Sequence, residues 1–151
     1  MIKNLTVKDA HQKQADGYTY VDVRSIPEFE QAHPAGALNV PLLHRDPATG
    51  QMSPNLEFVE VMKGAFAPDA KLLIGCQAGA RSAQAAQLLS AAGFTDVTNV
   101  LGGFGGARDQ MTGVVRAEGW VQAGLPVETS AAPGATYAEV RAQSAKGTRS
   151  R

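Results

Sequence analysis

The chain has 151 residues, of which 14 are basic and 14 acidic, so its formal net charge is zero. This length fits one domain, and a neutral chain has no overall field to hold nucleic acid or an anionic membrane. No stretch has the roughly 18 consecutive apolar residues of a membrane span, and the first residues form no apolar secretory run. We therefore expect a cytoplasmic protein whose partners include neither nucleic acid nor membrane.

Segments typical of strands alternate with segments typical of helices over about the first 125 residues. The predicted strands cover residues 2–5, 18–23, 37–40, 71–75 and 97–101. The predicted helices begin at Thr6, Ser25, Ser53 and Ser82, and a last one begins or continues at 120–123. The apolar run at 71–75 indicates a strand covered on both faces. This alternation predicts an α/β fold with a mostly parallel sheet.

The composition changes after Val127, where Ser, Ala, Pro, Gly and basic residues dominate. We expect residues 1–128 to form a single domain and residues 129–151 to form a loosely attached tail. A helical turn at 137–143 would be too short to be stable alone.

The chain has one cysteine, Cys76, which rules out an intramolecular disulfide and any metal site built on several cysteines. It follows the buried strand and begins the segment Cys76-Gln77-Ala78-Gly79-Ala80-Arg81-Ser82. Small residues let this backbone turn tightly, and the following helix adds unpaired N–H groups and its positive dipole end. The pattern predicts an anion-binding loop around the Cys76 sulfur, at the sheet edge where α/β proteins bind ligands. A lone cysteine is more often a small core residue, but this order of elements favours a functional role.

This segment resembles the active-site loop of the rhodanese family, the thiosulfate sulfurtransferases. The resemblance extends over roughly residues 5–128 through the segments Val21-Asp22-Val23-Arg24 with Glu28-Phe29, His33 with Gly36-Ala37 and Asn39-Val40-Pro41, Leu101-Gly102-Gly103-Phe104, and Gly124-Leu125-Pro126-Val127. It implies a rhodanese-like three-layer fold, with helices on both faces of the sheet. The chain is longer than the family pattern at 105–119, a segment that we expect to shape the pocket rim or extend a surface helix.

The resemblance also implies a two-step sulfur transfer. Cys76 takes a sulfur atom from a small anionic donor such as thiosulfate, becomes a persulfide, and passes the sulfur to cyanide, a cellular thiol or an acceptor protein. No metal or organic cofactor is expected. Arg81 would bind the donor's sulfonate, and Asp22 and Arg24 would brace the loop. The remaining substrate-binding positions would be Gln77, Ala78, Gly79, Ala80 and Ser82.

Other functions remain open for this fold. Dual-specificity phosphatases share it, but their loop places five residues between cysteine and arginine, whereas Gln77 to Ala80 are only four. The shorter loop suits one sulfur atom better than a tetrahedral phosphate. Arsenate reduction normally needs further thiols or a partner. A persulfide carrier or regulatory module that works with a partner protein is the main alternative. We expect Gly102 and Gly103 to allow a close backbone approach to the active loop.

Overall fold

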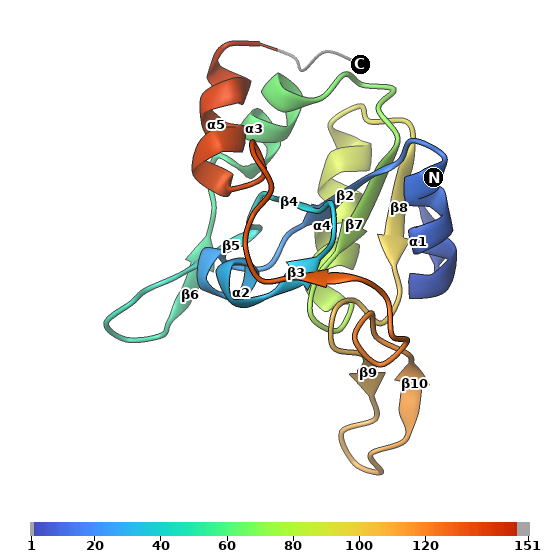
Figure 1. Cartoon of the computed structure of the whole chain (residues 1–151). Coiled ribbons are helices and arrows are strands. Elements are labelled where there is room, and N and C mark those ends of the chain that lie inside the picture. The colour runs from blue at the N-terminus through green and yellow to red at the C-terminus, as the bar shows by residue number, and fades with distance from the viewer. Residues whose placement is uncertain (1, 148–151) are drawn as a thin grey trace.

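A parallel β-sheet lies at the centre of the molecule in the computed structural model, which describes residues 2–147 (Figure 1). The strands of this sheet lie in the spatial order β1 (Lys3–Leu5), β8 (Val97–Val100), β7 (Leu72–Gly75), β2 (Thr19–Asp22) and β4 (Leu38–Asn39). Each neighbouring pair is parallel. Every residue of β7 is buried, as its continuous apolar run predicts. The predicted α/β fold with a mostly parallel sheet is confirmed.

Helices cover both faces of the sheet (Figure 1). Those within residues 2–147 are α1 (Val7–Ala15), α2 (Ile26–Gln31), α3 (Phe58–Ala65), α4 (Ala80–Ala91) and α5 (Tyr137–Ala145). One hydrophobic cluster includes residues of α1 and the fully buried Trp120. The second, larger cluster joins α3, α4 and α5 to the sheet. None of the helices in this part of the chain has the length and hydrophobicity to cross a membrane.

The predicted helix starts at Thr6 and Ser25 are confirmed by their caps. Thr6 Oγ1 accepts the Asp9 N–H at 3.3 Å. Ser25 and Glu28 form a capping box, in which the Glu28 carboxylate accepts the Ser25 N–H at 3.1 Å. These side chains bind N–H groups that the first turn of a helix leaves without a partner.

Three predicted element boundaries are wrong. The helix expected from Ser53 begins at Phe58, because Met52–Pro54 form strand β6 and pair with β5 (Leu43–Arg45). The helix expected from Ser82 begins two residues earlier, at Ala80. Residues 120–123 form turns rather than a helix.

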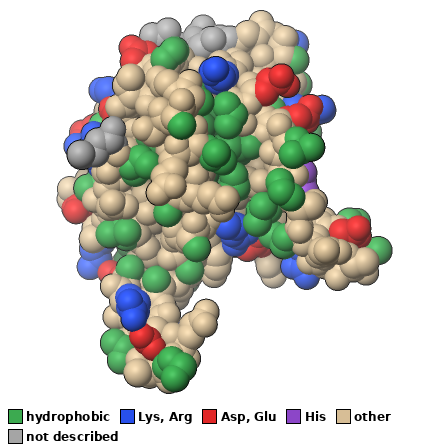
Figure 2. Space-filling view, turned by 180° about the vertical axis from the view of Figure 1, so that it is seen from behind, with side chains coloured by type: hydrophobic (Ala, Val, Ile, Leu, Met, Phe, Trp, Pro, Cys, Tyr) green, Lys and Arg blue, Asp and Glu red, His purple; other side chains and the backbone are tan. Residues whose placement is uncertain are grey.

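The segment at 105–119 forms a hairpin, not a surface helix. Strand β9 (Ala107–Arg108) pairs with β10 (Val115–Ala117), and the hairpin projects from the body of the molecule (Figure 1). Hydrophobic side chains lie on this projection (Figure 2). Met111, between the two strands of the hairpin, is 94% exposed. A shorter pair joins β3 (His33–Pro34) to β11 (Val127–Glu128).

Residues 135–145 pack against the domain and do not form the loosely attached tail that the composition predicted. Tyr137 and Val140 of α5 are buried in the larger cluster, and the Asn55 side-chain amide donates to the Tyr137 hydroxyl at 3.1 Å. Helix α5 is stable here because α3 covers it, which the composition of the segment does not reveal. Residues 148–151 of the predicted tail lie outside the described residues.

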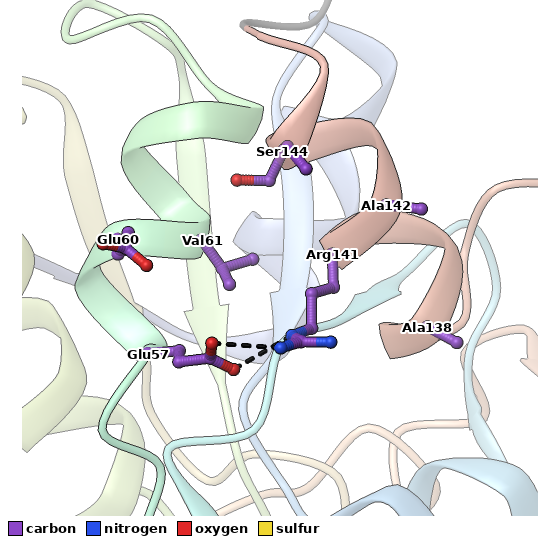
Figure 3. Close-up of a pocket in the computed structure, with 8 residues that line it drawn as sticks. Glu57, Glu60, Val61, Ala138, Arg141, Ala142 and Ser144 are labelled. Atoms are coloured by element: carbon purple, nitrogen blue, oxygen red, sulfur yellow. Dashed lines mark hydrogen bonds and ion pairs between the residues drawn. The ribbon is translucent and has the colours of Figure 1, made fainter.

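An open groove of about 480 Å³ runs between α3 and α5 (Figure 3). Arg141 of α5 binds both carboxylate oxygens of Glu57, at 2.9 and 3.0 Å. Gly64 of α3 allows the two helices to approach, because a Cβ at this position would lie 2.6 Å from the Ser144 carbonyl oxygen. The groove holds no cysteine and lies apart from the predicted active loop.

We predict that Gly64→Ala destabilises the protein by about 1–3 kcal/mol, because the added methyl group overpacks the contact between α3 and α5. Urea unfolding monitored by circular dichroism measures the change. Lys63→Ala, on the exposed side of the same helix, is the control. At an unpacked helix position Gly→Ala stabilises by roughly 0.5–1 kcal/mol. A gain of that size at Gly64 would contradict the close docking of α5.

Candidate active site

Cys76 follows the end of β7, and its side chain is enclosed by its own loop. The residue is only 2% exposed. The Gly79 N–H points at the Cys76 sulfur, with 3.1 Å between nitrogen and Sγ. Gly79 has φ +123°, a left-handed backbone conformation that disfavours residues with a Cβ. The glycine therefore lets the chain turn back so that a backbone donor faces the sulfur.

Helix α4 begins directly after this turn and places Ser82 beside the sulfur. The Ser82 residue is fully buried, and its Oγ lies 3.4 Å from Cys76 Sγ. The Ser82 hydroxyl also lies 2.6 Å from Asn99 Oδ1 and 3.1 Å from the Gly79 carbonyl oxygen. Sulfur, hydroxyl and the N-terminus of α4 thus meet at one end of the sheet, where backbone N–H groups favour an anion.

A glycine turn packs against the Cys76 loop, as predicted from Gly102 and Gly103. The Phe104 N–H donates to the Cys76 carbonyl oxygen at 2.7 Å, and the Gly105 N–H donates to the Gln77 carbonyl oxygen at 2.9 Å. A Cβ on Gly103 would lie 2.9 Å from the carbonyl carbons of both Cys76 and Gln77. The expected close approach is confirmed for Gly103, whereas Gly102 packs against the backbone of Glu118 instead.

Arg24 connects the end of β2 to its surroundings. Its guanidinium binds the Asp22 carboxylate, with 2.8 Å between Nη2 and Oδ2, and donates to the Ala32 carbonyl oxygen at 2.6 Å. It also reaches Gln77 Oε1 at 3.4 Å and stacks on the Phe104 ring, with 4.3 Å to the centroid. Asp22 and Arg24 are both almost fully buried. Arg24 thus contacts both the active loop and the glycine turn.

Arg81 is paired with Glu28, a partner that the sequence did not indicate. The two guanidinium nitrogens Nη1 and Nη2 donate to the two carboxylate oxygens at 2.8 and 3.1 Å. Partial burial opposes ionisation of Glu28, but hydrogen bonds from Arg81 and Ser25 outweigh it and lower the pKa of its carboxyl to about 2. The contact of Glu28 with a loop 53 residues away leaves no local signal in the sequence.

The predicted loop residues divide into two groups. Gly79 and Ser82 contact the sulfur, whereas Gln77 and Arg81 extend to Arg24 and Glu28. Ala78 and Ala80 are not buried and bring only methyl groups to the loop.

A shallow depression of about 390 Å³ lies beside the loop. Its lining residues come from α2, the loop and the glycine turn, and are Arg24, Glu28, Gln31, Ala32, Gln77 and Phe104. The two arginines at this place, Arg24 and Arg81, are both matched by carboxylates. The side chains therefore bring little net charge, and the backbone N–H groups are the main features that attract an anion.

Comparison with known proteins agrees with this geometry. Residues 6–109 match the family model of the rhodanese-like domain. The chain belongs to the rhodanese family. Thiosulfate sulfurtransferase 16 of the Arabidopsis thaliana chloroplast is 36% identical over 125 residues, which cover 83% of this chain and 92% of the relative. Thiosulfate sulfurtransferase 18 of the same plant is 36% identical over 105 residues, covering 68% and 76%.

Solved structures share this fold. The crystal structure of Rv0390 from M. tuberculosis superposes with a TM-score of 0.65 at 24% identity and covers 85% of this chain and 98% of that one. The rhodanese-like domain of the Anabaena sp. Alr3790 protein superposes with a TM-score of 0.61 at 19% identity, covering 85% and 80%. The predicted three-layer rhodanese fold is confirmed, and relatives with sulfurtransferase names support a sulfurtransferase.

We predict that the Arg81–Glu28 pair makes stability depend on pH in acid. Because the pKa of Glu28 falls from its ordinary 4.5 to about 2 on folding, its contribution is fully present above about pH 4.5 and is lost as the pH approaches 2. The difference in unfolding free energy between wild type and Glu28→Gln should be constant from pH 7 to 5 and shrink below pH 4.5.

Urea titrations at several pH values test this expectation. Glu30→Gln removes an exposed carboxylate from the same helix and controls for the general loss of charge. A difference that does not change between pH 5 and pH 3 would contradict an ionised pair.

Proposed function

We propose that the protein is a thiosulfate sulfurtransferase that works through a persulfide on Cys76. The observation that carries this proposal is the Gly79 N–H directed at Sγ, in a loop that leads into the N-terminus of α4. Donors arranged in this way stabilise a sulfur anion, which is both the nucleophile and the leaving group of sulfur transfer. The family and its named relatives support the same reaction class.

In the first step, the Cys76 thiolate attacks the outer sulfur of thiosulfate. A sulfur–sulfur bond forms to Sγ, the sulfur–sulfur bond of the donor breaks, and sulfite leaves with the electron pair. In the second step, cyanide or a thiolate attacks the outer sulfur of the persulfide, and Cys76 leaves as a thiolate. A disulfide-type bond is about 2 Å long, so the persulfide carries the reactive sulfur outward from a cysteine that is itself only 2% exposed.

Arg81 has a secondary role in this proposal. Its guanidinium is shared with Glu28, so a donor sulfonate competes with a carboxylate for the same N–H groups. The loop amides would bind the anion, and Arg81 would add to this attraction. Asp22 and Arg24 would brace the loop through Gln77 and Phe104.

Phosphate transfer is a weaker proposal for the same residues. Four residues separate Cys76 from Arg81, and Arg81 is engaged by Glu28. A phosphate needs the arginine for bidentate binding, so the pair would have to open first. A cytoplasmic location, and a protein as sulfur acceptor, stay predictions.

We predict that mixing the protein with thiosulfate adds about 32 Da, the mass of one sulfur atom, at Cys76, and that cyanide removes it as thiocyanate. Intact-protein mass spectrometry measures both changes. Cys76→Ser should gain no sulfur and release no sulfite while keeping the fold. If wild type gains none from thiosulfate but accepts sulfur from a protein persulfide, the protein is a carrier rather than a thiosulfate enzyme.

We predict opposite effects for the two partners of the Arg81–Glu28 pair. Arg81→Ala should raise KM for thiosulfate about tenfold, because it removes a charge-assisted hydrogen bond to the donor. Glu28→Gln should lower KM a few-fold, because it frees Arg81 from its carboxylate. Steady-state thiocyanate assays measure both, with Arg116→Ala in the projecting hairpin as the control. Equal KM values in all variants would leave Arg81 without a role in donor binding.

A further inference from the structure

A chain of buried hydrogen bonds leads from the Cys76 sulfur to the protein surface. The sulfur lies 3.4 Å from Ser82 Oγ, which lies 2.6 Å from Asn99 Oδ1. Asn99 Nδ2 then donates to Asn4 Oδ1 at 3.0 Å. Ser82 and Asn99 are buried, whereas Asn4 is exposed. The chain therefore ends where solvent can replace or reorient its last member.

Counting protons shows that this arrangement fits only the thiol form of Cys76. The Ser82 hydroxyl has one proton and two nearby acceptors, and Asn99 Oδ1 at 2.6 Å takes it in preference to the Gly79 carbonyl oxygen at 3.1 Å. Ser82 can then only accept from the sulfur, and the thiol S–H supplies that bond. A thiolate has no proton to give, so the sulfur and the Ser82 oxygen would face each other as two acceptors.

Rotation of two amide groups resolves this conflict without moving the backbone. A 180° turn of the Asn99 amide exchanges its oxygen and nitrogen and makes Asn99 a donor to Ser82. The Ser82 hydroxyl can then donate to the thiolate, whose charge makes it a stronger acceptor than the Gly79 carbonyl oxygen. The Asn99 oxygen now faces Asn4, whose exposed amide turns in the same way and donates to it. The S–H bond of Cys76 is the only covalent bond that breaks, and its proton passes to solvent.

We infer that Asn99 is a positioning residue for the sulfur chemistry, and that it reverses the direction of this hydrogen-bond chain when Cys76 loses its proton. Asn99 does not touch the reacting sulfur. It acts through Ser82, which it converts from an acceptor to a donor. Both steps of the proposed sulfur transfer pass through the thiolate, so the inference rests on the proposed function for its purpose. Its test needs no sulfur donor.

The register of the sheet strands brings the members of this hydrogen-bond chain together. Asn99 of β8 pairs with Ile74 of β7 on one side and with Asn4 of β1 on the other. It lies one pair before the end of β7, beside the strand that leads into Cys76. A polar residue that is only 4% exposed in the middle of a sheet carries a desolvation cost, and the two hydrogen bonds offset that cost.

Other titratable groups near the sulfur stay constant in the test. Tyr20 of β2 and Arg81 of α4 interact electrostatically with Cys76, and Asp22 and Arg24 interact in turn with Tyr20. The Tyr20 hydroxyl is fully buried, and burial raises its pKa well above its usual value. None of these side chains is changed in the variants below, so their field on the sulfur is the same throughout.

Alkylation of Cys76 by iodoacetamide tests the inference, because this is the only cysteine in the sequence. Asn99→Asp keeps the shape of the side chain, but its carboxylate can only accept hydrogen bonds. The Ser82 hydroxyl therefore keeps donating to residue 99 and cannot donate to the thiolate. The midpoint of the pH profile of alkylation should rise by about one pH unit, which is tenfold slower labelling below the midpoint. Asn55→Asp, at another buried asparagine, is the matched control and should leave the midpoint unchanged.

Combining the substitution with Ser82→Ala separates a relay from direct repulsion by the new charge. Without the hydroxyl, Asn99→Asp should cause no further rise in the midpoint. An equal rise with and without Ser82 would overturn the inference, because the carboxylate would then act through space. An unchanged midpoint in Asn99→Asp would overturn it as well.

A surface variant keeps the inference testable if Asn99→Asp does not fold. Residue 4 is exposed, and the carboxylate of Asn4→Asp can only accept a hydrogen bond. It therefore keeps accepting from Asn99 Nδ2, which holds the Asn99 amide in the orientation that fits the thiol form of Cys76. The midpoint should again rise, and the rise should disappear with Ser82→Ala. No change in Asn4→Asp would then overturn the relay. Failure of thiosulfate to load Cys76 would instead count against the proposed function alone.

Discussion

Parallel pairing of β7 with β2 and β8 places the residues of the candidate site at one edge of the sheet. Asp22 of β2 is in register with Gly75, the last residue of β7, and Ile74 is in register with Asn99 of β8. Since parallel strands run in one direction, their carboxyl ends lie together. The Asp22 carboxylate, the Cys76 sulfur and the Asn99 amide therefore lie at the same edge of the sheet, although they are far apart in the sequence.

The site depends more on backbone than on side chains for its attraction to anions. Asp22 and Glu28 match the charges of Arg24 and Arg81. These buried and half-buried pairs fix the positions of α2, the loop and the glycine turn, since each bidentate contact allows little freedom of orientation. The Gly79 N–H is directed at the Cys76 sulfur, beside the N-terminus of α4. A backbone N–H does not titrate, so this donor is present at every pH.

Local patterns predicted most of the fold. Alternating apolar segments located the five sheet strands, capping residues located α1 and α2, and the small-residue loop after a buried strand located the site around Cys76. The family resemblance indicated the three-layer arrangement. The strands, the caps and the loop are each encoded in a short stretch of neighbouring residues, where hydrophobic period, turn residues and caps act directly.

Features that depend on contacts between distant segments were missed. Glu28 binds a loop 53 positions away, and Asn99 lies beside Cys76 only because of strand register. Helix α5 has a weak pattern of its own and is ordered by α3, which Gly64 allows to approach closely. The segment at 105–119 has polar and glycine residues that fit either a loop or a hairpin, and pairing of β9 with β10 decides between them. No single stretch of sequence carries this information.

The docking of α5 on α3 also has a consequence for the order of folding during synthesis. Asn55, just before α3, and Tyr137, at the start of α5, are 82 positions apart. At the roughly 5–20 residues per second of translation, the ribosome needs about 4–16 s to add this length of chain. Throughout that interval the apolar face of α3 has no cover from α5 in the nascent polypeptide. The larger hydrophobic cluster can close only after the site-bearing strands have been made, so the apolar face of α3 stays open to contacts with other chains until α5 has been synthesised.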